Sequence, residues 1–166
     1  MHLGEDASEE NAKAAGRSAR YVHFACHGTM NERFPLDSAL LLSVPGQSAE
    51  GRENGTLYAW EIFERVRLDA DLVTLSVCRS AAGAEFAGEG LIGLTRAFQY
   101  AGARSVLAAL WGLGDETTVE FMTKFYRLLK HGIPKDEALR RTQVAAIRAG
   151  RHPVRWAAFQ LYGDWR

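Results

Sequence analysis

A histidine and a cysteine follow two apolar segments that have the length and composition of buried strands. Residues 21–26 (YVHFAC) lead into His27, and residues 72–77 (LVTLSV) lead into Cys78. In an open parallel sheet, residues just beyond the carboxyl ends of neighbouring strands meet in one crevice. A thiol is nucleophilic as its thiolate, and an adjacent imidazole can take its proton near neutral pH. The pattern therefore indicates a thiol nucleophile with a histidine base, their side chains about 4–7 Å apart before substrate binds.

Gly28 adds a second part of that chemistry. Because no side chain follows His27, the Gly28 N–H can approach a bound carbonyl oxygen, and with the N–H of Cys78 it would form an oxyanion hole. The same residues also fit a plainer interpretation, in which Cys78 is a buried structural cysteine and His27 an ordinary loop histidine. Spacing alone leaves both interpretations open.

An α/β framework is needed to bring these residues together. Apolar patterning and turn residues predict strands at residues 21–26, 39–43, 72–77, 105–111 and 156–161. Helical periodicity and capping residues predict helices at residues 5–16, 58–65, 91–101, 116–130 and 134–147. Strands that alternate with helices predict a layered α/β fold with a mostly parallel sheet flanked by helices. The loops at residues 44–56 and 79–89 are expected to be the most mobile segments.

Composition limits the classes of function. The 166 residues fit one domain, and 47% hydrophobic residues suffice for a core. Equal numbers of basic and acidic residues give a formal net charge of zero, which argues against nucleic-acid or membrane-surface binding by bulk charge. No apolar run approaches the ~20 residues of a membrane span, and the first residues do not resemble a signal peptide. With only two cysteines and no expected disulfide framework, a cytoplasmic location is predicted.

Longer motifs surround the two candidate catalytic residues. Between residues 19 and 164, VHFACHG is followed in order by LDSALLLS, LVTLSVCRSAAG, GEGLIGLTRAFQYAGARSVLAALWGLGDETT and HPVRWAAFQLYGD. Together they resemble the CHAT domain family, a caspase-like branch of the clan CD cysteine peptidases that is related to separase. The resemblance implies a caspase-like fold, with His27 in HFACHG and Cys78 in LSVCRS at the positions of the catalytic dyad. Val77 stands where the family more often has alanine.

The resemblance also implies substrates and partners. A caspase-like endopeptidase cleaves peptide bonds in protein or peptide substrates and uses no cofactor or metal. CHAT domains are often fused to tetratricopeptide repeats, so repeat or sensor modules of a longer protein are expected partners. The family domain usually continues upstream of the histidine strand, so residues 1–166 are expected to be a single CHAT domain truncated at its N-terminal side. The alternative function is a catalytically inactive caspase-like domain that serves as an interaction scaffold.

Asp115 is the candidate for substrate selection. The resembling stretch of separase-like enzymes borders the pocket for the residue before the cut bond, and an acidic group there favours a basic side chain. Because Asp115 directly precedes the helix expected at residues 116–130, it also fits an N-cap. Asp37 and Glu89 are weaker candidates for the same pocket.

Two further motifs have structural interpretations. Residues 88–93 (GEGLIG) match the dinucleotide fingerprint, but they begin ten residues after Cys78 and put Glu89 where a pyrophosphate would bind. We expect these glycines to let a helix pack close to the sheet. His23, Cys26 and His27 resemble a zinc cluster, yet alternation along a strand points Cys26 away from the two histidines, so no metal is expected.

Overall fold

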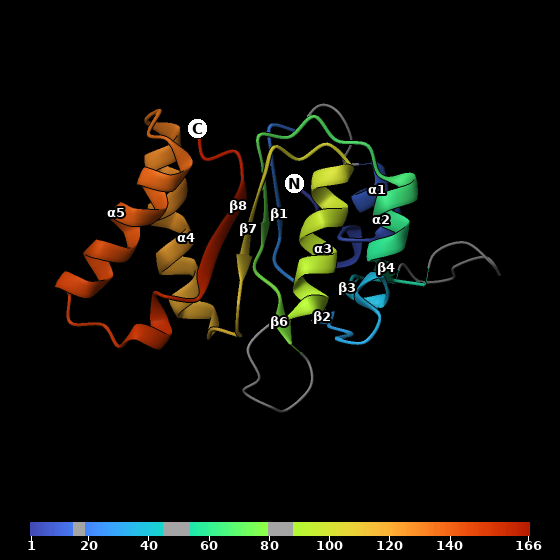
Figure 1. Cartoon of the computed structure of the whole chain (residues 1–166), viewed down its shortest axis with the longest axis horizontal. Coiled ribbons are helices and arrows are strands. Elements are labelled where there is room, and N and C mark those ends of the chain that lie inside the picture. The colour runs from blue at the N-terminus through green and yellow to red at the C-terminus, as the bar shows by residue number, and fades with distance from the viewer. Residues whose placement is uncertain (15–18, 45–53, 80–87) are drawn as a thin grey trace.

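The computed structural model describes residues 1–14, 19–44, 54–79 and 88–166 (Figure 1). Its elements are, in chain order, η1 (Gly4–Asp6), α1 (Glu9–Ala14), β1 (Tyr21–Phe24), β2 (His27–Thr29), η2 (Pro35–Asp37), β3 (Ala39–Leu41), β4 (Thr56–Tyr58), α2 (Ala59–Arg65), β5 (Leu72–Leu75), β6 (Cys78–Arg79), α3 (Glu89–Tyr100), β7 (Ser105–Ala109), α4 (Asp115–Lys130), α5 (Lys135–Arg148), η3 (Pro153–Arg155) and β8 (Phe159–Gly163). Most of the loops expected at residues 44–56 and 79–89 lies outside the described residues, so their mobility stays a prediction.

The central sheet has the strand order β1-β5-β7-β8. Strands β1, β5 and β7 run parallel, and β8 returns antiparallel to β7. This arrangement confirms the mostly parallel, helix-flanked sheet predicted from the sequence. Because β1 and β5 are neighbours, with Phe24 opposite Leu75 at their ends, the segments that follow them leave the sheet side by side.

Strands β5 and β7 at the middle of the central sheet are buried on both faces, because their side chains alternate between two helical layers. Helices α2 and α3 lie on one side of the sheet, and α4 and α5 lie on the other (Figure 1). Val73 and Leu75 of β5 belong to the core that includes Phe98 of α3, whereas Leu72 belongs to the core that includes Phe125 of α4. All residues of β5 are buried. Burial on both faces explains why the sequence of this strand is almost entirely apolar, with Thr74 as its single polar residue.

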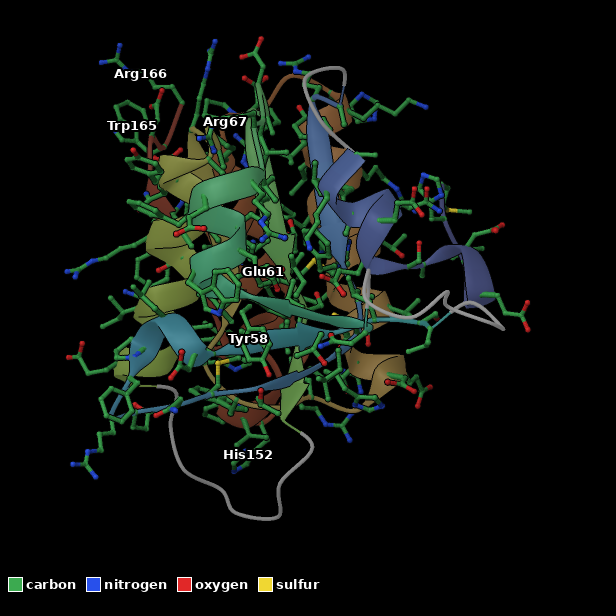
Figure 2. All side chains as sticks on the ribbon, turned by 90° about the vertical axis from the view of Figure 1, so that its right-hand side faces the viewer. Tyr58, Glu61, Arg67, His152, Trp165 and Arg166 are labelled. Atoms are coloured by element: carbon green, nitrogen blue, oxygen red, sulfur yellow. The ribbon has the colours of Figure 1, made fainter. Side chains whose placement is uncertain are left out.

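A second, smaller sheet has the order β4-β3-β2-β6. Strands β2, β3 and β4 cross the direction of the central strands when the molecule is viewed from the side, whereas β6 continues that of β5 (Figure 2). We predicted the strand at residues 39–43, but we took residues 27–29 as the end of one strand and the start of a loop. We also missed β4 and β6, and placed the end of the β5 strand at residue 77 instead of 75. Strands of two or three residues carry too little periodicity to be recognised in a sequence.

The glycines of GEGLIG lie where α3 meets the segment of residues 30–38. A Cβ atom on Gly90 would lie 2.9 Å from Ser38 Oγ, and one on Gly93 would lie 2.4 Å from the carbonyl oxygen of Pro35. Side chains at these two positions would push the helix away. The glycines do allow the helix to pack closely, but at these positions the neighbour is the segment after β2, and it is the apolar face of α3 with Phe98 that packs on the sheet.

Two element boundaries differ from the prediction. Strand β8 begins at Phe159, because residues 153–155 form a short 3₁₀ helix and Trp156 donates its indole N–H to the carbonyl oxygen of Arg151 at 3.2 Å. The helix expected at residues 5–16 is divided into η1 and α1. Among the described residues, no helix has the length and apolar character needed to cross a membrane.

Candidate active site

His27 and Cys78 are the first residues of two neighbouring parallel strands, β2 and β6. They stand directly opposite each other in the register, followed by Gly28 opposite Arg79. His27 is exposed. The side chain of Cys78 is outside the described part of the chain, so the expected separation of the two side chains stays a prediction. What the backbone establishes is that the histidine and the cysteine are adjacent residues of one sheet.

The central sheet explains why the histidine and the cysteine stand opposite each other in register. Each follows a central strand after a break of two residues, at residues 25–26 and 76–77. Pairing continues through the break, because the N–H of Ser76 donates to the carbonyl oxygen of Phe24 at 2.9 Å. Equal breaks after paired strand ends preserve the register. The two residues therefore follow the carboxyl ends of β1 and β5, as expected, but as the start of a second sheet.

Gly28 is buried between its neighbours in the small sheet. A Cβ atom at this position would lie 2.4 Å from Val77 Cγ1 and 3.0 Å from the carbonyl oxygen of Ala39. Real Cβ atoms do not approach neighbours so closely, so the absence of a side chain is required by packing. The expected oxyanion role of Gly28 is a separate matter, and it stays a prediction.

The small sheet is buried on one face and only partly open on the other, where Ala39 is also 0% exposed. Thr29, Ala39 and Tyr58 stand in one row across β2, β3 and β4, and His27 begins the neighbouring row. Residues that stand directly opposite each other share a face of the sheet. The other face carries Leu40, which is 0% exposed. His27, Thr29 and Tyr58 therefore open on the same, accessible face.

A groove continues this open face beyond Thr29. Tyr58 and Trp60 form an aromatic wall, with ring centroids 6.1 Å apart and nearly parallel planes. Tyr58 lies at the end of β4, next to α2 (Figure 2). Charged side chains also border the groove, from Glu32, Arg33 and Asp37. Sequence analysis named Asp37 as a pocket candidate but missed the aromatic wall. The polar–apolar–polar order of residues 56–58 is the available signal for a half-buried strand there.

A buried ion-pair network attaches α1 to the small sheet. Lys13 Nζ lies 2.5 Å from Glu9 Oε1 and 2.9 Å from Glu61 Oε1. Glu61 accepts the N–H of Tyr58 at 3.2 Å, and Glu9 accepts the N–H of Gly55 at 3.1 Å. The network therefore holds both ends of β4 in place. Sequence analysis missed it, because Lys13 and Glu61 are 48 positions apart.

His23 lies on the α4 side of the central sheet. Its Nε2 is 2.9 Å from Ser76 Oγ, and its ring stacks on Tyr126 of α4 with centroids 5.6 Å apart. Although part of the residue is exposed, burial of the ring lowers the pKa of His23. Cys26 instead packs against the core on the α3 side. The two residues therefore point apart, as alternation along the strand predicts.

Asp115 is the first residue of α4. The N-cap is Gly114, which has extended backbone angles (φ −64°, ψ 146°), so the interpretation of Asp115 as N-cap is wrong. Its side chain is exposed, and no described residue forms a hydrogen bond or ion pair with it. Helix α4 follows β7, which is the neighbour of β5. Asp115 and Cys78 thus follow adjacent parallel strands, and the role of Asp115 in substrate binding stays a prediction.

A parallel sheet whose neighbouring strands continue into a histidine and a cysteine, with helices on both faces, defines a caspase-like α/β domain. The family model of the CHAT domain matches residues 1–164. The chain therefore belongs to the CHAT domain family, whose domains are caspase-like and related to cysteine peptidases.

Two curated relatives are named for repeats. Tetratricopeptide repeat protein 28 of Mus musculus is 39% identical over 101 residues, and that of Homo sapiens is 29% identical over 195 aligned positions. The matches cover 60% and 98% of this chain, but only 4% and 8% of the two relatives. The chain thus spans less than a tenth of the length of these proteins, and the domain is similar to one small part of them.

Proposed function

We propose that this chain is a cysteine endopeptidase in which His27 and Cys78 form the catalytic dyad. The observation that carries the proposal is the register of β2 and β6, where these two residues stand directly opposite each other. Members of a parallel pair at the same register position share a face of the sheet. Membership of a family related to cysteine peptidases supports the same pair.

The chemistry assigns a role to each group. The Cys78 thiolate attacks the carbonyl carbon of the scissile bond, and the resulting oxyanion accepts hydrogen bonds from the N–H groups of Gly28 and Cys78. His27 donates a proton to the leaving amine as the carbon–nitrogen bond breaks. It then takes a proton from a water molecule that attacks the thioester, which releases the carboxylic acid and restores the Cys78 thiolate beside protonated His27.

Substrate binding is proposed on two sides of the dyad. Asp115 has an exposed carboxylate without a partner among the described residues, and it binds a basic side chain before the cut bond. The groove beyond Thr29, with its aromatic wall of Tyr58 and Trp60, receives further substrate residues on the face that carries His27. We also infer that the domain works within a longer repeat protein, as the names of its relatives suggest.

A peptide library tests the activity. Wild-type protein is incubated with mixed peptides, and the products are identified by mass spectrometry. We expect cleavage after arginine or lysine, and a loss of at least ~10³-fold in Cys78→Ala, as for other lost nucleophiles. The matched control, Cys26→Ala, keeps the activity. If wild-type protein does not cleave, or if Cys78→Ala cleaves as well as the wild type, the domain is an inactive scaffold.

Asp115 is tested separately with the same library. We expect Asp115→Asn to reduce cleavage after basic residues by about tenfold, because an amide cannot form the charge-assisted bond. A preference for leucine or methionine that is the same in wild type and in Asp115→Asn would refute the pocket role. The peptidase assignment does not depend on that result.

A further inference from the structure

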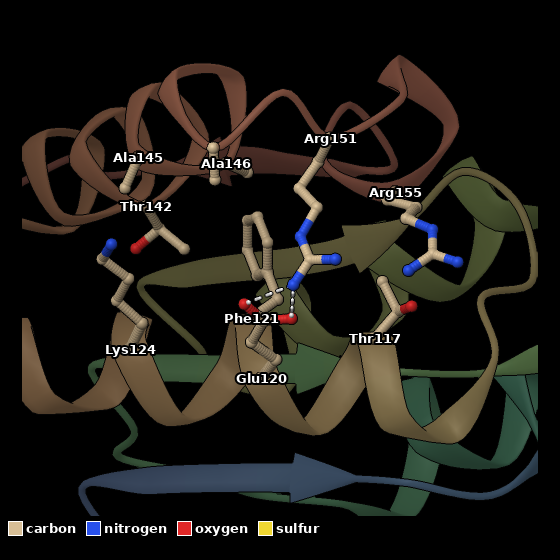
Figure 3. Close-up of a pocket in the computed structure, with 10 residues that line it drawn as sticks. Thr117, Glu120, Phe121, Lys124, Thr142, Ala145, Ala146, Arg151 and Arg155 are labelled. Carbon is tan, nitrogen blue, oxygen red and sulfur yellow. Dashed lines mark hydrogen bonds and ion pairs between the residues drawn. The ribbon is translucent and has the colours of Figure 1, made fainter.

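A groove lies between α4 and α5 (Figure 3), on the side of the molecule away from the small sheet (Figure 1). One wall is formed by Thr117, Phe121 and Lys124 of α4. Ala145 and Ala149 of α5 are in the opposite wall. These positions recur every three or four residues, so the groove follows both helices for about two turns.

Small side chains keep the groove open. The alanines of α5 do not fill the space above α4, and Phe121 provides an apolar floor that is 5% exposed. Thr142, which also lines the groove, uses its hydroxyl to donate to the carbonyl oxygen of Ala138 at 2.8 Å. Apart from the ion pair of Glu120 with Arg151, the middle of the groove is therefore mostly apolar.

The two ends of the groove are basic. Lys124 lies at one end and Arg155 at the other, next to Thr117, whereas Arg151 reaches between them towards Glu120 (Figure 3). Arg151 pairs with Glu120 at 3.3 Å. Within the described ranges, neither Lys124 nor Arg155 has an acidic partner. Since the chain has a formal net charge of zero, this concentration of positive charge is a local feature.

The segment that carries the two arginines is held in place by its own hydrogen bonds. The N–H of Arg155 donates to the carbonyl oxygen of His152 at 2.9 Å, and the carbonyl oxygen of Arg151 accepts the indole N–H of Trp156 at 3.2 Å. Gly150 begins the segment with a positive φ of 69°. Fixed backbone positions mean that little ordering is needed when a ligand binds.

We propose that this groove binds an acidic peptide segment in a polyproline II conformation, with two carboxylates three residues apart and therefore on the same face of the peptide. One carboxylate pairs with Lys124 and the other with Arg155, while the residues between them lie over Phe121 and the alanines. The spacing follows from geometry. From Thr117 to Lys124 the helix rises about 10 Å, and three residues of polyproline II chain cover about 9 Å and bring the side chain back to the same face. The proposal does not depend on peptidase activity.

An NMR titration tests the site. ¹⁵N-labelled full chain is titrated at low salt with Ac-Ala-Glu-Ala-Ala-Glu-Ala-NH2, and with Ac-Ala-Ala-Glu-Glu-Ala-Ala-NH2 as the control of equal charge. We expect shift changes confined to residues 117–124 and 142–155, with tighter binding of the spaced peptide. Lys124→Gln and Arg155→Gln each weaken its binding by about fivefold, as for an exposed ion pair. Arg148→Gln, a change on α5 outside the groove lining, leaves binding unchanged.

Three results would overturn the proposal. Equal affinity for the two peptides would show that spacing is not recognised. Unchanged binding in both groove variants, with spectra that show them folded, would show that the site lies elsewhere. Displacement of the spaced peptide by an equal concentration of inorganic phosphate would define a small-anion site and not a peptide site.

Discussion

The two sheets of this domain differ in how they are buried: the central sheet forms the core, and the small sheet carries the candidate site residues. The central sheet has helices on both faces, and the four residues of β5 are all buried. The small sheet is covered on one face only, so β2 alternates between exposed and buried residues. The covered sheet supplies the core. The half-open sheet leaves His27 and Thr29 exposed and Tyr58 partly exposed.

The same chain segments contribute to both sheets. Strand β1 continues into β2, and β5 into β6, after breaks of two residues. The strong apolar pairing of the central strands therefore sets the register of two short strands that could not hold it alone. A rigid sheet that positions a short, accessible one is a general way to place reactive residues on a stable framework.

Replacement of matched leucines in the two sheets is expected to have the largest effect. Leu75 on β5 is 0% exposed, whereas Leu41 on β3 is partly exposed and stands opposite His27. We expect Leu75→Ala to lower the free energy of unfolding by about 3 kcal/mol, since it leaves a cavity in the core, and Leu41→Ala by about 1 kcal/mol. Urea unfolding measures both. Equal decreases in the free energy of unfolding for the two variants would contradict the conclusion that the central sheet supplies most of the stability.

A methyl group at Gly28 tests the packing of the small sheet. Gly28→Ala would bring a Cβ atom to 2.4 Å from Val77 Cγ1. We expect it to lower the free energy of unfolding by about 2 kcal/mol, as overpacking does. Gly112→Ala is the matched control, because a Cβ atom there meets nothing within 4 Å. If the two variants have the same stability in urea, the small sheet is looser than described.

Ionisation of Tyr126 is expected to make the stability of the folded protein fall at alkaline pH. Its hydroxyl donates to Thr74 Oγ1 at 2.7 Å, and burial raises the pKa of Tyr126 from 10.0 to about 12. The unfolded chain thus loses this proton first, so the stabilisation is complete below pH 10 and is lost as the pH rises towards 12. Between those values, wild type should lose about 1–2 kcal/mol more than Tyr126→Phe in urea unfolding. Parallel pH curves would contradict this.

His23 has the opposite pH dependence and a smaller effect. Burial beside Ser76 and Tyr126 lowers the pKa of His23 below 6.5, so the folded protein disfavours the charged ring. Stability is therefore complete above pH 6.5 and falls as the pH drops below it. In thermal unfolding between pH 7 and pH 5, we expect His23→Gln to lose less stability than the wild type. A steeper loss of stability in His23→Gln than in the wild type would contradict a lowered pKa of His23 in the folded protein.

The central sheet could be predicted from the sequence, and the small sheet could not. Residues 72–77 and 105–111 form apolar runs of strand length, and the amphipathic helices between them favour parallel pairing. Strand β2 has three residues, and β6 has two. Their pairing depends on β1 and β5 lying next to each other, which no local pattern encodes.

The candidate site was only partly visible in the sequence. His27 and Cys78 stood out because each follows an apolar run, and the sheet topology explains their adjacency. Asp115 was wrongly interpreted as an N-cap, because Gly114 takes that position. The groove bordered by Tyr58 and Trp60, which also includes Thr29 and Asp37, and the groove between α4 and α5 depend on contacts between residues distant in sequence.

The central claim is that His27 activates Cys78, and the rate of Cys78 alkylation tests it most directly. In a Cys26→Ala background, the reaction of Cys78 with iodoacetamide is followed by mass spectrometry from pH 5 to pH 9. A histidine partner holds the thiolate at low pH, whereas an unassisted thiol ionises near pH 8.5. We predict that His27→Ala slows alkylation at pH 6 by at least about tenfold and moves the profile to that of a free thiol. Superimposable profiles for the two proteins would contradict the dyad.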